Sequence, residues 1–243
     1  ITLGCLREEN RADAENSVRI TSLGKAALTL GLHPRLACVA LSALRVENAG
    51  ESTEKENGLS KKERGGLSSC AESALQCVLA YSPYADSPSA LQKRFSSDLI
   101  KRLAKCAYRF PDLCGNSGAT ADCIRGAAVL LLAGFPDRIA RLEGDGTYRF
   151  PSGRVASLPK KERDAFRVFP EWIVAPVVDA GEKEGRIYRW EALSAEKAEA
   201  WLSVRSETYT ETEFAEGTHS LRKTEYTCFG KIVLAERRVA VQD

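Results

Sequence analysis

Basic side chains gather in one stretch of the chain, between residues 138 and 163. This stretch contains seven basic and three acidic residues, and two aromatic residues, Tyr148 and Phe150, lie among them. Arginine binds phosphate through two parallel hydrogen bonds, and an aromatic ring offers a nucleobase a stacking surface. These residue types together predict contacts with a single strand of nucleic acid. The candidates are Arg138, Arg141, Tyr148, Arg149, Arg154, Lys160 and Lys161. The alternative is that the aromatic rings are core side chains of a small barrel.

A second basic group lies between residues 86 and 109, where six bases stand against two acids. Arg94, Lys101, Lys105 and Arg109 recur at helical spacing, opposite an apolar stripe, which predicts an amphipathic helix with a cationic outer side. That side could dock onto an acidic protein partner. It is equally typical of an ordinary solvated helix face.

The motifs that hold nucleotides or activate nucleophiles are absent from the sequence. No G-x-x-x-x-G-K-[ST], G-x-G-x-x-G or G-x-S-x-G pattern occurs. Gly24-Lys25 resembles the end of a phosphate loop, but Ala26 lacks the hydroxyl that would hold Mg²⁺. The two histidines, His33 and His219, are too few for a zinc centre or a multi-histidine relay. We therefore expect no catalytic residue, metal or cofactor in this chain, and no activity from it alone.

Composition and charge indicate an ordinary globular protein. The 243 residues are 44% hydrophobic and 28% charged, with a net charge of +2. No apolar run approaches the ~20 residues that span a bilayer, so we expect no membrane partner. The eight cysteines form no Cys-x-x-Cys pair and mostly lie among Ala, Leu and Val, as reduced core residues do. A reducing, cytoplasmic compartment is expected. The start at Ile1 and the absence of methionine suggest a piece of a longer chain.

Helical patterns dominate the first 134 residues, after a short strand over 17–21. Ser22 is the expected cap of the first helix, and Pro34 opens the next. Further helices are predicted over 67–81, 88–108 and 120–132, with Ser87 as the cap of the second of these and Pro88 in its first turn. The polar stretch 47–66 carries too little apolar surface to offset its ordering entropy, so we expect a mobile insertion there.

Period-two patterns with regular turns replace the helical ones from Arg138 onward. Eight short strands and one helix, over 195–202, are expected in this half. That content favours a small, mostly antiparallel barrel of the oligonucleotide-binding (OB) type, and an α+β fold class for the whole chain. The predicted strands cover 139–142, 147–150, 154–157, 172–178, 186–193, 208–214, 222–229 and 232–241.

Two segments carry a family likeness. ITSLGKA (20–26) followed by LHPRLA (32–37) resembles the stretch that opens the helicase-associated helical domain of DEAH-box ATP-dependent helicases. Later blocks are similar to one bacterial member of that family and extend the likeness nearly from end to end. They are FPDRIAR (135–141), GTYRFPSGR (146–154), EWIVAP (171–176), LRK (221–223) and FGKIVL (229–234). The insertion 47–66 and YSPY (81–84), in place of an acidic motif, depart from the pattern.

The resemblance implies a domain order and a role. Residues 1–32 would be the tail of a winged-helix domain, 33–134 a helical ratchet domain, and 135–243 an OB-like barrel with adjoining strands. The parent protein would hydrolyse ATP with Mg²⁺ in motor domains that this chain lacks. This part would then bind single-stranded RNA or DNA and couple hydrolysis to translocation or unwinding. The alternative is a regulatory, protein-docking module that makes no direct contact with nucleic acid.

Overall fold

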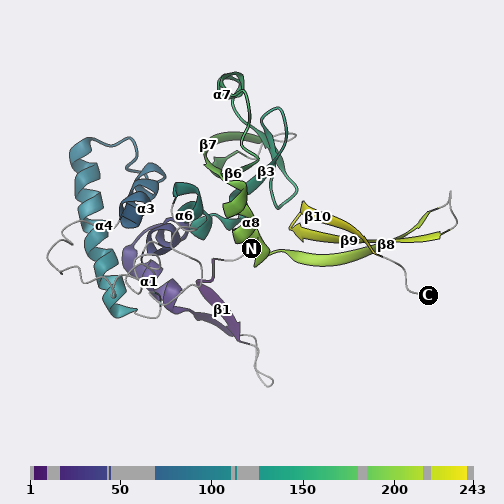
Figure 1. The fold of residues 1–243 in the computed structure, drawn as a ribbon. Coiled ribbons are helices and arrows are strands. Elements are labelled where there is room, and N and C mark those ends of the chain that lie inside the picture. The colour runs from purple at the N-terminus through teal and green to yellow at the C-terminus, as the bar shows by residue number, and fades with distance from the viewer. Residues whose placement is uncertain are drawn as a thin grey trace, which may run out of the picture. The chain divides into compact units, whose positions relative to one another are not determined.

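Helices dominate the first part of the chain and strands the second, in keeping with the α+β prediction (Figure 1). The computed structural model describes residues 3–9, 17–42, 44, 69–110, 113, 126–179, 185–215 and 220–239. Two compact units divide the chain, Ile1–Pro136 and Asp137–Asp243. The expected insertion 47–66 lies outside the described residues. Among the helices of the described part, none is both long enough and apolar enough to cross a membrane.

The first unit begins with a hairpin that leads into a helix. Strand β1 (Leu6–Glu9) pairs antiparallel with β2 (Ser17–Ile20), and α1 (Ser22–Leu30) follows. The cap of α1 is Thr21 and not Ser22 as predicted, because the Thr21 hydroxyl accepts the Gly24 N–H at 3.1 Å. A Cβ on Gly24 would lie 2.3 Å from the Cys5 carbonyl oxygen, so only glycine lets the helix approach the hairpin this closely.

The remaining helices of the first unit surround an apolar core. They are a helix over 34–42, α3 (Ser69–Ala80), α4 (Ser89–Arg109) and α6 (Ala127–Gly134). Helix α6 is buried on nearly every side, as its uninterrupted apolar sequence predicts. The predicted cap of α4 is wrong: Pro88 occupies that position, and no side chain caps the helix. The predicted start of α6 at residue 120 lies outside the described residues.

The second unit contains a closed barrel of five strands. They are β3 (Ile139–Gly144), β4 (Thr147–Arg149), β5 (Val155–Ser157), β6 (Trp172–Val178) and β7 (Gly185–Leu193). Their order is β3-β4-β5-β7-β6, closed by β3 against β6. Four pairings are antiparallel and one, β5 with β7, is parallel. The inward residues form one core that includes Tyr148, Phe150, Ile173 and Ile187.

A short helix that the sequence did not predict, α7 (Lys160–Ala165), joins β5 to β6. None of its residues is buried, so it lacks the apolar stripe by which helices are recognised. A 3₁₀ turn, η2 (Pro136–Arg138), was also not predicted.

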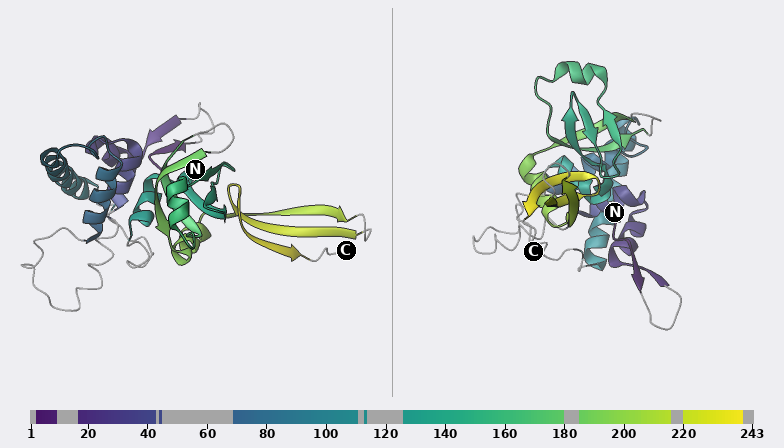
Figure 2. Two further views of the ribbon diagram at one scale, coloured as in Figure 1. Left: turned by 90° about the horizontal axis from the view of Figure 1, so that it is seen from above. Right: turned by 90° about the vertical axis from the view of Figure 1, so that its right-hand side faces the viewer.

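A separate three-stranded sheet follows the barrel. Helix α8 (Ala195–Ser203) leads into β8 (Glu207–Ala215), β9 (Ser220–Phe229) and β10 (Ile232–Val239), which lie side by side in the order β10-β9-β8 (Figure 2). The turn between β9 and β10 docks on the barrel, because the Lys231 N–H donates to the Pro151 carbonyl at 2.8 Å. All eight predicted strands are present, and the ends that can be compared differ by at most two residues; the predicted end of the last strand, at 240–241, lies outside the described residues.

Candidate nucleic-acid interface

Three of the predicted phosphate ligands are paired with carboxylates. Arg138 lies 3.3 Å from Asp137, Arg141 lies 3.1 Å from Glu171, and Arg149 donates from Nε to Glu143. An arginine already paired with an acid presents less net charge to a phosphate, because the ligand must compete with the carboxylate. Arg141 and Arg149 also face each other across β3 and β4, where two unpaired like charges would be destabilising. Glu171 and Glu143 therefore neutralise the positive charges of Arg141 and Arg149 on these two strands.

Arg141 also links the barrel to the three-stranded sheet. Its Nη1 donates to the Val233 carbonyl at 2.9 Å, and its guanidinium lies 5.5 Å from the centroid of the Trp172 ring. Both contacts use the planar, fixed geometry that distinguishes arginine from lysine. The first role of this side chain in the structure is to join parts of its own unit.

Tyr148 does not present a stacking surface. Its side chain is 0% exposed and belongs to the barrel core, where its hydroxyl donates to the Pro170 carbonyl at 2.9 Å. Burial raises the pKa of Tyr148 to about 12. A ring enclosed on both faces cannot stack on a base, so the prediction for Tyr148 fails and the alternative, a core aromatic, holds. Period-two alternation along β4 was the signal for it.

The other three predicted ligands face solvent. Arg154, which precedes β5, and Lys160 and Lys161, which open α7, are exposed. Within the part of the chain that the structure describes, their side chains form no hydrogen bond or ion pair. These three bases are available to a ligand from solvent.

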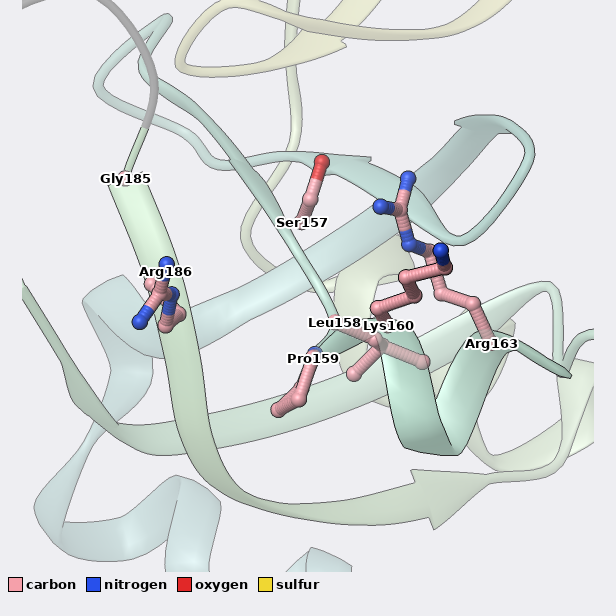
Figure 3. Close-up of a pocket in the computed structure, with 7 residues that line it drawn as sticks. All are labelled: Ser157, Leu158, Pro159, Lys160, Arg163, Gly185 and Arg186. Carbon is pink, nitrogen blue, oxygen red and sulfur yellow. The ribbon is translucent and has the colours of Figure 1, made fainter. Parts of the chain in front are cut away.

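A hollow of about 480 Å³ lies where β5, α7 and β7 meet (Figure 3). Figure 3 shows Lys160 and Arg163 rising from α7 on one side of it and Arg186 on β7 on the other. Three of its lining residues are basic, and none of the seven described ones is acidic. The lining residues are Ser157, Leu158, Pro159, Lys160, Arg163, Gly185 and Arg186.

The parallel pairing of β5 with β7 creates this hollow. Ala156 pairs with Gly185 and Ser157 with Arg186, so residues almost thirty positions apart share one edge of the barrel. A Cβ on Gly185 would lie 2.9 Å from the Asp179 carbonyl oxygen and 3.1 Å from the Ala156 Cβ, so glycine permits this close pairing. No local signal links Arg186 to the basic stretch 138–163, and the sequence analysis missed it for that reason.

Arg163 is held by the turn between β3 and β4. A Cβ on Gly146 would lie 2.8 Å from Cγ and 2.9 Å from Cδ of Arg163, so the arginine stem packs directly on this glycine. The neighbouring Glu162 accepts the indole N–H of Trp190 at 2.7 Å, which ties α7 to β7. Arg163 belongs to the basic stretch that the sequence singled out, but it was not among the predicted ligands.

Two acids of the described chain near the hollow, Asp179 and Glu162, have donors of their own. Asp179 accepts the Arg186 backbone N–H at 2.7 Å and the Tyr188 hydroxyl at 2.9 Å. The hydrogen bond to Asp179 raises the pKa of Tyr188 above its usual value. Among the described residues that line the hollow, three are basic and none is acidic.

The cationic face of α4 is present in the first unit. Leu99, Leu103 and Cys106 are buried on its inner side. Its predicted outer bases are exposed, namely Arg94, Lys101, Lys105 and Arg109. Lys93 and Lys101 also line a shallow hollow of about 520 Å³ beside α3. Across the described ranges, no group of three His, Cys, Asp or Glu side chains could hold a metal ion.

Comparison with known proteins gives a likeness in fold. No family model and no curated protein sequence matches the chain. The crystal structure of the DExH-box NTPase HrpB from E. coli matches 99% of this chain with a TM-score of 0.62 at 20% identity. A structure of the Escherichia coli DEAH/RHA helicase HrpB matches the same share with a TM-score of 0.48 at 17% identity. The matched part is 26% of either HrpB chain, so this chain spans about a quarter of that protein's length.

Proposed function

We propose that the chain is the nucleic-acid-binding accessory region of a DEAH-box, ATP-dependent helicase. In this proposal ATP and Mg²⁺ bind motor domains outside the chain, and the chain holds a single strand while hydrolysis drives translocation or unwinding. The fold likeness to HrpB and the helicase-like segments at 20–37 and 135–154 support this assignment.

The strand order of the barrel supports an OB-like assignment for residues 135–243. OB-folds are five-stranded barrels that bind oligonucleotides over their second and third strands and the adjoining loops. Here those strands are β4 and β5, and Arg154, Lys160 and Lys161 lie in the segments that flank β5. Residues 1–32 and 33–134 take the winged-helix and ratchet roles in the same proposal.

The observation that carries the proposal is the exposure of Arg154, Lys160 and Lys161 beside β5. Exposed bases without acidic partners release counterions when they neutralise phosphates, which makes affinity depend on salt. We give Arg138, Arg141 and Arg149 a smaller part, because each is already paired with an acid.

Fluorescence anisotropy of a labelled single-stranded oligonucleotide tests this proposal. Affinity should fall linearly in a log-log plot against salt, with a slope that drops by about one for each of Arg154→Gln, Lys160→Gln and Lys161→Gln. Arg237→Gln, on the exposed edge strand β10, is the matched control and should change nothing. Binding that does not depend on salt would contradict the proposal.

The protein-docking alternative is favoured by one observation, the exposed cationic face of α4. It predicts that Lys101→Gln with Lys105→Gln weakens the binding of an acidic protein ligand in the same salt titration. It also predicts that oligonucleotide affinity is negligible at every salt concentration.

A further inference from the structure

We propose that the hollow between β5, α7 and β7 is a binding site for a phosphate group of the nucleic-acid strand, with Lys160, Arg163 and Arg186 as its ligands (Figure 3). This inference rests on the proposed function and deepens it. It names the chemical group that is bound, and it adds two arginines that were not among the predicted ligands.

The charges in the hollow call for an anion. Lys160 and Arg163 are three residues apart on α7, so their positive ends share one side of the helix, an arrangement that is destabilising without a counterion. Arg186 adds a third positive charge from β7. A phosphate oxyanion satisfies all three, because arginine binds it through two hydrogen bonds and lysine as a point charge.

Arg163 is fixed in place at some cost to stability. Its Nε is buried and has no hydrogen-bond partner in the described part of the chain. Buried donors without partners are rare in native proteins, and each costs free energy. The packing of the stem on Gly146 holds the guanidinium at the hollow before any ligand arrives. Because the arginine is already held in place, less conformational entropy of its side chain is lost when a ligand binds there.

The size and lining of the hollow fit a nucleotide unit. Its volume of about 480 Å³ lies within the usual range of small-molecule sites. Pro159, which is partly exposed, supplies apolar surface beside the basic side chains, against which a sugar could pack, and Ser157 adds a hydroxyl. The Ser157 hydroxyl lies 2.8 Å from that of Thr147, which orients it.

The first experiment measures oligonucleotide anisotropy against salt with the whole chain and four variants. Lys160→Gln and Arg186→Gln should each lower affinity by about tenfold and reduce the salt slope by about one. Arg186→Lys keeps the positive charge but loses the planar guanidinium, which makes two parallel hydrogen bonds to a phosphate. Compared with Arg186→Gln, it should therefore recover the full salt slope but only part of the affinity. Arg167→Gln removes an exposed charge outside the hollow and should leave both quantities unchanged.

The outcomes separate the two proposals. If the wild-type chain binds the oligonucleotide but Arg186→Gln keeps its affinity and salt slope, the phosphates lie elsewhere: the hollow proposal is overturned, and the proposed function, which does not depend on Arg186, stands. If the wild-type chain binds no oligonucleotide, the proposed function fails. The second experiment, with inorganic phosphate, then tests by itself whether the hollow binds phosphate.

The second arm uses inorganic phosphate as the probe. The indole N–H of Trp190, assigned with Trp190→Phe, reports on α7 because it is bonded to Glu162, next to Arg163. Inorganic phosphate should shift this NMR signal in a saturable way in the wild-type chain and not in the Lys160→Gln, Arg186→Gln double variant. Chloride at equal ionic strength should have no effect. A shift that is equal in both proteins, or absent from both, would overturn the phosphate site.

Discussion

At the scale of single residues, arginines of the same stretch differ by the partners that the fold gives them. Arg141 and Arg149 lie directly opposite each other on β3 and β4, and each has a glutamate within reach. Arg163 is held by packing on Gly146, in a hollow whose described lining residues include no acid. Pairing decides whether an arginine stabilises the chain or remains available to a ligand.

Tyr148 allows a prediction about stability that is separate from binding. Tyr148→Phe should lower the free energy of unfolding by about 1 kcal/mol, because the Pro170 carbonyl loses its donor inside the barrel. Oligonucleotide affinity should not change, because the ring is buried. Denaturant unfolding and anisotropy measure the two quantities. A large loss of affinity with normal stability would mean that the ring reaches the ligand.

The pKa of Tyr148 adds a pH signature to the same variant. Burial raises the pKa to about 12 in the folded chain, so the hydroxyl loses its proton more readily when the chain is unfolded. The stability that comes from this group is therefore fully present below pH ~10, the pKa of the unfolded chain, and is lost as the pH rises toward 12. Tyr148→Phe should lack this component. The difference between the unfolding free energies of the wild-type chain and of Tyr148→Phe, followed against pH, gives the contribution of Tyr148 apart from the other tyrosines.

At the scale of elements, short turns hold the strands of the second unit in place. The turn between β9 and β10 lies on Pro151, and Gly230 there has a φ of +59°. A Cβ on Gly230 would lie 2.3 Å from the Pro151 carbonyl oxygen. Trp201 of α8 packs edge-on against Phe229 at a centroid distance of 5.4 Å, beside the same turn. The three-stranded sheet is thus attached at its base.

Gly230→Ala tests this attachment. The left-handed backbone alone should cost about 1 kcal/mol for alanine, and the clash with Pro151 adds to it. We expect a lower midpoint of denaturant unfolding and faster amide exchange in β9 and β10. Lys231→Ala is the control, because it keeps the backbone N–H that donates to Pro151. A Gly230→Ala chain as stable as the wild type would show that the turn is not a point of attachment.

At the scale of the whole molecule, the proposed function assigns ATP hydrolysis to motor domains and not to this chain. Gly24 and Lys25 lie inside the first turn of α1, capped by Thr21, and form a helix start rather than a phosphate loop. The purified chain should therefore hydrolyse no ATP above a buffer blank. Hydrolysis that survives purification and disappears in Lys25→Ala would contradict this expectation.

The sequence by itself determined most of the elements, but not β1, α7 or η2, and it determined which side of α4 faces a core. The strong apolar run Trp172–Val178 and the apolar stripe of α4 gave β6 and the buried side of the helix, because local periodicity encodes local burial. Helix α7 escaped prediction for the same reason, since none of its residues is buried. Five of its six residues are charged and the sixth is Ala165, so no apolar period can be detected.

The partners of each side chain were decided only by the tertiary structure. Closure of the barrel buries Tyr148, and the register of β3 and β4 places Arg141 opposite Arg149. The parallel pairing of β5 with β7 brings Arg186 to the hollow that Lys160 also lines. Charge and residue type can be read along the chain. Whether a base meets an acid, a core or an open hollow depends on contacts between residues far apart in sequence, which form only when the barrel closes.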